Sequence, residues 1–242
     1  MELVSTAGMA VAGNNMGFMI KGLIPYKLFG QELWITTTHV SILIVDVFLI
    51  IFFLAVRKRM KNPEQVPKGL QNVAEIIVDM LDNMVKGSMG KNAGKFANYI
   101  GSIFIFILIS NISGVFGLRP PTADYGVTFP LGVMSFLIIQ YNNIKHNKLG
   151  AAKALLDPIP LFLPVNLIGE IAVPISLSLR LFGNVLSGTV MMSLVYSLIP
   201  VFCRFGFPAV LHIYFDLFAG AIQTYVFCML TMTYVNDKLS DE

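Results

Sequence analysis

The sequence predicts an all-α integral membrane protein, with about five transmembrane helices and one amphipathic helix at the membrane surface. Two features of the composition predict this class: 55% of the 242 residues are hydrophobic, and only 13% are charged. A soluble domain carries roughly 25% charged residues, so this chain has about half the charge that a water-facing surface needs. The composition therefore argues against a soluble enzyme, and the net charge of +3 gives no basic field for nucleic acid.

Apolar stretches of about 20 residues mark the transmembrane spans, because a helix of that length crosses the hydrocarbon core of a bilayer. The first span is predicted over 36–56, and the second and third lie within 96–144. The last stretch, 160–235, is too long for one span and is broken by Pro and Gly near position 200, which predicts a long tilted helical hairpin. All of these elements belong to one membrane domain that covers 1–242.

The segment 67–90, between the first two spans, predicts an amphipathic helix. Its apolar and charged residues recur at helical spacing on opposite faces. The apolar face comprises Val73, Ile76, Ile77, Met80, Leu81 and Met84, and the polar face comprises Glu75, Asp79, Asp82 and Lys86. The segment is too polar to span, so it lies at the membrane surface or docks on a neighbouring subunit, and these two interpretations are compatible.

The basic residues are distributed unevenly along the chain, which predicts its orientation. Twelve of the 17 lie in the loops after the first and third spans or, as Lys238 does, in the carboxyl-terminal tail, and four lie in the other connections. Because cytoplasmic loops carry the excess of Lys and Arg, the amino terminus is expected outside and the carboxyl terminus in the cytoplasm. The one basic residue left over is Arg180, inside an apolar stretch.

Arg180 is the first candidate functional residue, because a charge at the bilayer centre costs from about 2.5 to more than 10 kcal/mol. An arginine also stays protonated where a lysine can become neutral. Such a residue usually faces a water cavity, an ion path or a partner acid. The alternatives are an arginine that snorkels to the interface, or a structural ion pair with Glu170 or Asp216.

Polar residues on the same predicted hairpin extend from both sides of Arg180. Glu170 precedes it by ten residues, about 15 Å along a helix, and Asn184 follows it by one turn. Unpaired polar groups cost several kcal/mol in lipid, so their presence calls for a function or a partner. These residues predict a polar run that reaches Arg180 from the cytoplasmic side.

The returning helix carries the second polar run. His212 and Asp216 form an i, i+4 pair in its outer half, and Gln223 lies about two turns deeper. Two half-paths that are interrupted by a fixed cation make a poor open pore, because the cation repels protons and metal ions. The arrangement suits a moving carboxylate on a partner subunit, although a channel or transporter of its own stays open at this point.

Three strings of residues resemble one known family. PISLSLRLFGNVLSG, with Glu170 ahead of it, resembles the signature helix of the a subunit of F-type ATP synthases. QTYVFCMLTMTY resembles the last helix of that subunit, and NISGVFGLRPPTADYGVT resembles the connection between its second and third spans. The resemblance covers roughly 33–235, and the SLRLFGN string is highly specific.

The resemblance implies an ion-translocating stator subunit that couples transmembrane proton flow to ATP synthesis, with Na⁺ as the alternative ion. Its implied partners are a rotating c-subunit ring, a b-subunit peripheral stalk, the soluble catalytic ATPase head and the lipid of a bacterial-type plasma (inner) membrane. The chain alone is then no enzyme, and no cofactor or metal is implied. No Walker A type loop is present, so ATP chemistry belongs to the head.

The resemblance also assigns roles to individual residues. Arg180 matches the essential arginine that faces the ring carboxylate and separates two half-channels. Asn184 and Gln223 match its polar neighbours. Glu170 matches the acidic position of the cytoplasmic half-channel, and Asp216 matches that of the external half-channel.

One departure from the family pattern suggests a chain-specific relay. The family often has Glu or His after the glycine that closes the motif, whereas this chain has Thr189, which does not take up a proton at ordinary pH. We hypothesise that Asp216, helped by His212 on the same helical face, hands over protons on that side. The alternative for His212 is a packed or interface-facing histidine.

Other polar residues and rival functions leave open interpretations. Asp46, in the first span, is expected to pair with another subunit or a neighbouring helix. Asn111 and Ser113 either line the external entrance or make hydrogen bonds between helices.

Two rival functions make different demands on the sequence. An independent secondary transporter would show repeated interrupted helices, and an intramembrane hydrolase would need a nucleophile and base; neither pattern is present.

Overall fold

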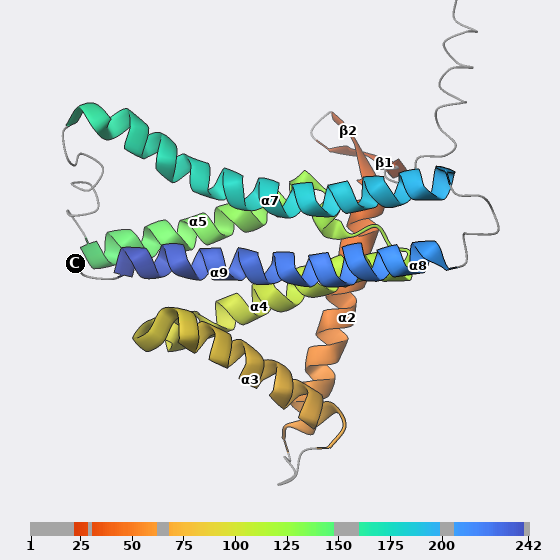
Figure 1. Cartoon of the computed structure of the whole chain (residues 1–242), viewed down its shortest axis with the longest axis horizontal. Coiled ribbons are helices and arrows are strands. Elements are labelled where there is room, and N and C mark those ends of the chain that lie inside the picture. Colours follow the sequence, from red (N-terminus) through yellow and green to blue (C-terminus); the bar gives the residue numbers. More distant parts are fainter. Residues whose placement is uncertain (1–21, 29–30, 62–67, 148–159, 199–205, 240–242) are drawn as a thin grey trace, which may run out of the picture.

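The computed structural model describes residues 22–28, 31–61, 68–147, 160–198 and 206–239 (Figure 1). Five helical stretches among these residues are long and apolar enough to cross a membrane. They are Thr37–Arg59, Leu70–Phe116, Tyr125–Asn147, Leu163–Leu198 and Val210–Leu239. The predicted all-α membrane class is confirmed, and the chain is a multi-pass membrane protein.

A short β-hairpin, which the sequence analysis did not predict, precedes the first span. Strands β1 (Gly22–Leu28) and β2 (Gln31–Thr36) pair in antiparallel register, with Leu28 opposite Gln31. Runs of six or seven residues give a weak periodic signal beside spans of 20 residues. The hairpin leads directly into α2 (Thr37–Arg59), which corresponds to the predicted first span.

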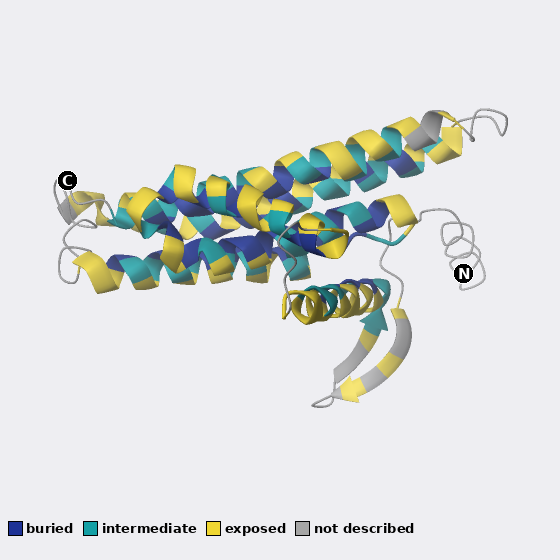
Figure 2. Ribbon diagram, turned by 90° about the horizontal axis from the view of Figure 1, so that it is seen from below, coloured by how far each residue is buried: buried dark blue, intermediate teal, exposed yellow. Residues whose placement is uncertain are grey.

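Helix α2 is bounded by polar residues at both ends and packs through one narrow stripe. At its start the backbone N–H of Thr36 donates to Nδ1 of His39 at 3.3 Å. At its end, the basic side chains of the last turn interact favourably with the negative end of the helix dipole. The buried stripe consists of Thr38, Ser41, Val45 and Leu49, and Figure 2 shows that exposed residues cover much of the remaining helix surface.

The chain reverses between α3 (Leu70–Met89) and α4 (Ala93–Ile112). A short 3₁₀ turn, η1 (Gly90–Asn92), joins them, and Gly90 takes a φ of +52°, which glycine adopts without a steric penalty. Figure 1 shows the two helices diverging from this turn as the arms of a V. Helix α3 is the amphipathic helix predicted over 67–90.

The apolar face of α3 that the sequence predicted meets two environments in the structure. Leu81 is buried in the core, and Ile77 and Met84 pack against it. Val73, Ile76 and Met80 are exposed, because α4 and α9 cover only part of the helix. This second apolar stripe remains available for lipid.

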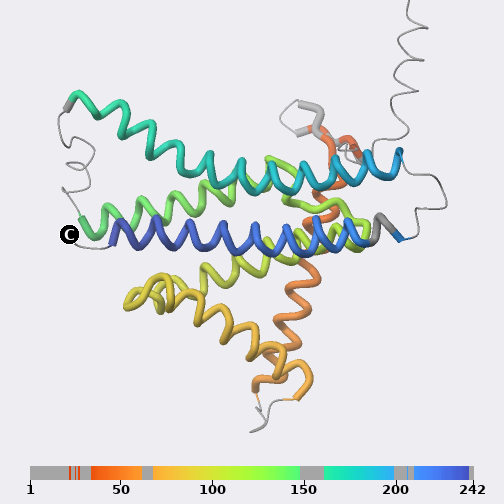
Figure 3. The backbone as a smooth tube through the Cα atoms, in the orientation of Figure 1, coloured from red at the N-terminus to blue at the C-terminus, as the bar shows by residue number. Residues whose placement is uncertain are grey.

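The predicted hairpin is formed by α7 (Leu163–Leu198) and a return segment that lies antiparallel to it. At 1.5 Å per residue, the 36 residues of α7 extend about 54 Å. Pro174 lies inside α7 and removes one backbone hydrogen bond, and Figure 3 shows the helix bent. The predicted turn near position 200 falls in 199–205, outside the described residues.

The return segment changes helix type along its length. It comprises α8 (Phe207–His212), the π-helix η6 (Ile213–Ala219) and α9 (Gly220–Leu239). Helix α5 (Tyr125–Asn147) packs against both α7 and α9. The hairpin is therefore supported along its side by α5.

The apolar core joins α3, α4, α5, α7 and α9. Leu177 and Leu181 contribute to it from α7, and Phe227 and Met232 contribute from α9. Between helices in lipid, close packing rather than exclusion of water supplies the attraction. This packing fixes the distance between the two helices that carry the predicted functional residues.

We predict that a methyl group at Gly132 weakens the contact between α5 and α7. A Cβ there would lie 2.7 Å from the backbone oxygen of Pro174 and 3.2 Å from Cβ of Ser178. Gly132→Ala should therefore lower the unfolding free energy by about 1–3 kcal/mol. The measurement is the unfolding temperature of the protein in detergent, which should fall.

Gly87→Ala is the matched control, because the space around Gly87 on α3 is open. It should raise stability by roughly 0.5–1 kcal/mol through helix propensity. Equal stability of the two variants would contradict the packing argument.

Candidate functional site

Arg180 is exposed on α7, whereas its neighbours Leu177, Ser178 and Leu181 are buried. Among the residues that the structure describes, it has no hydrogen bond or ion pair. Glu170 and Asp216, its two candidate partners for a structural ion pair, contact other side chains instead. Arg180 thus presents its charge outward from the helix bundle.

The surface around Arg180 is made of small and polar residues. Ser176, Gly183 and Ser187 are all exposed and lie on the same side of α7 as Arg180. No atom lies within 4 Å of the position that a Cβ of Gly183 would take. Small residues let the backbones of membrane helices approach closely, so this face suits a neighbouring helix.

Three polar side chains contact one another in series where α7 ends and the return segment begins. We name them the Asp216 cluster: Tyr196, His212 and Asp216. Nδ1 of His212 lies 2.6 Å from Oδ2 of Asp216, and its Nε2 lies 3.0 Å from the hydroxyl of Tyr196. The i, i+4 contact of His212 with Asp216 that the sequence predicted is confirmed.

Asp216 sits within the π-helix η6 and packs against a glycine. A Cβ on Gly114 would lie 2.9 Å from Cγ of Asp216, so only glycine fits at that position without movement. Single π turns inside α-helices occur frequently at functional sites. The backbone thus departs from regular α-helix where the carboxylate is placed.

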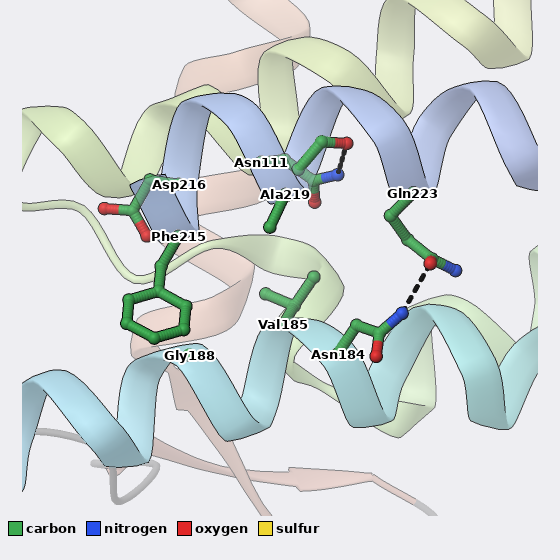
Figure 4. A pocket seen from close by; sticks show the side chains of 9 residues that line it. Asn111, Asn184, Val185, Gly188, Phe215, Asp216, Ala219 and Gln223 are labelled. Carbon is green, nitrogen blue, oxygen red and sulfur yellow. Dashed lines mark hydrogen bonds between the residues drawn. The ribbon is translucent and has the colours of Figure 1, made fainter. Parts of the chain in front are cut away.

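A pocket opens beside Asp216 and runs toward the middle of the hairpin (Figure 4). Its polar lining residues are Asn111, Asn184, Asp216 and Gln223. It is partly open to solvent, and its inner space is large enough to admit about one water molecule. The pocket therefore has both the volume and the polar partners that water needs.

Asn111 connects α4 to the return segment and also lines this pocket. Its Nδ2 donates to the carbonyl oxygen of Gly220 at 3.0 Å and to Oγ1 of Thr224 at 3.3 Å, while its Oδ1 accepts from Thr122 at 2.6 Å. The hydrogen bonds between helices that were considered for Asn111 are therefore present, and its place at an external entrance stays a prediction. Ser113 bonds the backbone oxygen of Ser110 at 2.7 Å and is absent from the pocket lining.

Asn184 and Gln223 join α7 to α9 in the interior end of the pocket. Nδ2 of Asn184 donates to Oε1 of Gln223 at 2.5 Å, as Figure 4 shows. Gln223 is only 4% exposed, and its Nε2 has no partner among the described residues. A buried donor of this kind is normally satisfied by water or a partner.

A second polar cluster lies toward the other end of the hairpin, which we name the Glu170 cluster: Gln140, Glu170 and Lys238. Oε1 of Glu170 accepts from Nζ of Lys238 at 2.6 Å, and its Oε2 accepts from Nε2 of Gln140 at 2.5 Å. The cluster therefore joins α5, α7 and α9.

Mainly apolar side chains separate the two polar clusters inside the bundle, and the buried hydroxyls of Ser178 and Thr231 in this region donate to the backbone of their own helices. Leu177 and Leu181 lie between Glu170 and Asn184 along α7, and Phe227 lies on α9 between Gln223 and Lys238; these three apolar residues are almost completely buried. The described part of the chain therefore offers two polar regions with an apolar core between them.

Thr189 and Asp46 take no part in either cluster or in the pocket lining. Thr189 donates to the backbone oxygen of Leu186 at 2.8 Å, and it does not line the pocket. Asp46 is exposed on α2. The ion-path role of Thr189 therefore stays a prediction without geometric support.

The sequence reasoning missed Tyr196, Gln140 and Lys238. Lys238 was counted only as a tail charge that sets orientation, and Tyr196 stood in an apolar run without a motif. Their side chains become visible as partners only through contacts across the hairpin, because 68 positions separate Lys238 from Glu170.

Comparison with known proteins identifies similar chains. A family model described as ATP synthase A chain matches residues 38–236. The chain is 38% identical over 226 residues to the sodium ion specific ATP synthase subunit a of Propionigenium modestum, covering 86% of this chain and 75% of the relative.

Two further relatives carry the name ATP synthase subunit a. The protein of a Sulfurihydrogenibium species is 34% identical over 180 residues, covering 72% of this chain and 84% of the relative. The protein of Limosilactobacillus reuteri is 33% identical over 239 residues, covering 90% of this chain and 98% of the relative.

Proposed function

The chain belongs to the ATP synthase A chain family, and on this premise we propose that it conducts ions to and from the carboxylates of a rotating c ring through two half-channels that Arg180 separates. It is a membrane subunit of the F-type ATP synthase. Family membership argues against the alternative of an independent secondary transporter. The proposal concerns how this subunit moves ions.

The observation that carries the proposal is the interruption between the two polar clusters. An ion that enters at the Asp216 cluster meets buried Leu177, Leu181 and Phe227 before it reaches the Glu170 cluster. The exposed face of α7 around Arg180 offers the alternative route. A carboxylate on a neighbouring rotor helix that passes this face can carry the ion from one cluster to the other.

Arg180 decides which charge state of the rotor carboxylate stands opposite it. At an effective dielectric constant of about 20, opposite charges 4 Å apart attract by about 4 kcal/mol. This exceeds the roughly 2.3 kcal/mol that one charge gains across 100 mV. An ionised carboxylate therefore stays beside Arg180 until an ion neutralises it, and only the neutral form moves into lipid at low cost.

The two clusters then take different ends of the path. The Asp216 cluster and its pocket form the external half-channel, and Glu170 marks the cytoplasmic one. This assignment places the amino terminus outside and the carboxyl terminus in the cytoplasm of a bacterial-type plasma membrane. The b-subunit peripheral stalk holds the chain still while the soluble catalytic head makes ATP.

The translocated ion is proposed to be H⁺, with Na⁺ as the second candidate. The contact between His212 and Asp216 favours H⁺, because an imidazole takes up and releases a proton near neutral pH. The relative in Propionigenium modestum is named as sodium ion specific, which is the observation that favours Na⁺.

We predict that Arg180→Ala abolishes coupled ATP synthesis, because no fixed cation then holds the ionised rotor carboxylate. Synthesis driven by an ion gradient in sealed vesicles should fall at least tenfold, the loss expected when about 1.4 kcal/mol or more of differential stabilisation disappears. Arg57→Ala removes an exposed positive charge at the end of α2 and should leave synthesis close to the parent rate. Normal proton-driven synthesis by Arg180→Ala would remove the central assignment.

We predict that His212→Ala slows synthesis and flattens its dependence on external pH between about pH 6 and about pH 8, where an imidazole titrates. Tyr196→Phe should produce a smaller change in the same direction, since it removes the hydroxyl that contacts Nε2. The matched control is Tyr214→Phe, because Tyr214 lies in the same segment and is exposed. An unchanged pH profile in His212→Ala would disprove the relay.

We predict that a proton gradient drives synthesis in sealed vesicles when sodium has been removed. The measurement is the rate of ATP formation after an imposed pH difference, with and without added Na⁺. A strict requirement for a sodium gradient would replace H⁺ by Na⁺ and leave the assignment of Arg180 intact.

A further inference from the structure

Lys238 binds one oxygen of the Glu170 carboxylate, although the sequence indicated only that this lysine helps to set the orientation of the chain in the membrane. Its Nζ lies 2.6 Å from Oε1 of Glu170, and Nε2 of Gln140 lies 2.5 Å from Oε2. The two carboxylate oxygens are therefore bound by side chains of two different helices. Lys238 comes from α9 and Gln140 comes from α5.

The backbone of Lys238 is held as well. Its carbonyl oxygen accepts a hydrogen bond of 3.2 Å from Nδ2 of Asn147, which also donates to Oδ1 of Asn143 at 3.0 Å. The end of α5 thus fixes the position from which the lysine side chain reaches α7. The contact is part of a three-helix junction.

Two other basic groups near this junction interact elsewhere. Nζ of Lys145 lies 5.6 Å from the ring centre of Tyr141, and Nδ1 of His146 lies 3.4 Å from Oδ1 of Asn147. Within the described ranges, Lys238 is the charged residue that forms an ion pair with Glu170. A partly exposed ion pair contributes little to stability, so stability alone does not explain the arrangement.

We propose that Lys238 is a positioning residue that acts through Glu170. Its ammonium group lies beside the carboxylate as a fixed countercharge and thereby speeds the exit of translocated protons. The inference rests on the proposed function, in which Glu170 marks the cytoplasmic half-channel. A proton that leaves a ring carboxyl group binds a Glu170 oxygen and then passes to water. The ammonium stabilises the ionised carboxylate that results.

Lys238→Gln is the sharpest test, because the amide can still donate to Glu170 while the positive charge is lost. The carboxylate of Glu170 then loses the positive charge that lies 2.6 Å from its Oε1. Proton exit during ATP synthesis should slow, and the synthesis rate should fall by about threefold, the order of effect expected of a partly exposed ion pair. ATP-driven pumping, which takes up protons at Glu170, should fall less, and its alkaline limit should move to higher pH.

Lys238→Arg should restore the parent ratio of synthesis to pumping, since it returns the charge. A merely structural role for Lys238 would lower both directions together and leave the pH limit in place. Lys145→Met is the matched control: it removes a positive charge at the same end of α5 without touching Glu170 and should leave the ratio unchanged. All variants are compared at equal subunit content in the assembled complex.

Glu170→Gln, alone and combined with Lys238→Gln, tests whether the lysine acts through the carboxylate. The second substitution should add no further change in the ratio. The inference is overturned if Lys238→Gln keeps the parent ratio and pH limit, or if its effect persists in the Glu170→Gln background. Coupled synthesis that survives Arg180→Ala would instead overturn the proposed function, so the two failures are distinguishable.

Discussion

A polar group inside a bilayer must find a partner, and this constraint organises the chain. Most of the polar residues on the hairpin satisfy it within the protein: Glu170 with Lys238, Asp216 with His212, and Asn184 with Gln223. Arg180 is the exception, because it is charged and faces outward without a partner among the described residues. A cation in that position is costly, so its partner is expected on another subunit.

Apolar packing explains why the unpaired charge of Arg180 matters for the proposed coupling. If polar contacts ran continuously along the hairpin, ions would cross without a carrier and no rotation would be coupled to their flow. Leu177 and Leu181 on α7 meet Phe227 on α9 between the two clusters. In the proposed function, the core that holds the helices together also closes the direct route, so that stability and coupling depend on the same side chains.

The spans and the hairpin could be predicted from the sequence, because lipid permits few alternatives for long apolar helices. The i, i+4 contact of His212 with Asp216 could be predicted from their spacing. The pairing of side chains between helices could not be predicted in the same way. Lys238 meets Glu170, and Tyr196 meets His212, only because of how the helices rotate and how α5 packs against them. Asn111 was left with two alternatives, because its hydrogen bond to the return segment depends on helix packing that the sequence does not show.

The two clusters differ in the kind of cation that stands beside the carboxylate, and this difference fits opposite tasks. Beside Asp216 lies an imidazole, which changes its charge near neutral pH and can therefore pass a proton onward. Beside Glu170 lies an ammonium, a compact point charge that donates hydrogen bonds and accepts none. The first arrangement suits the collection of protons from outside. The second suits their release, since a permanent positive charge repels a proton that has arrived.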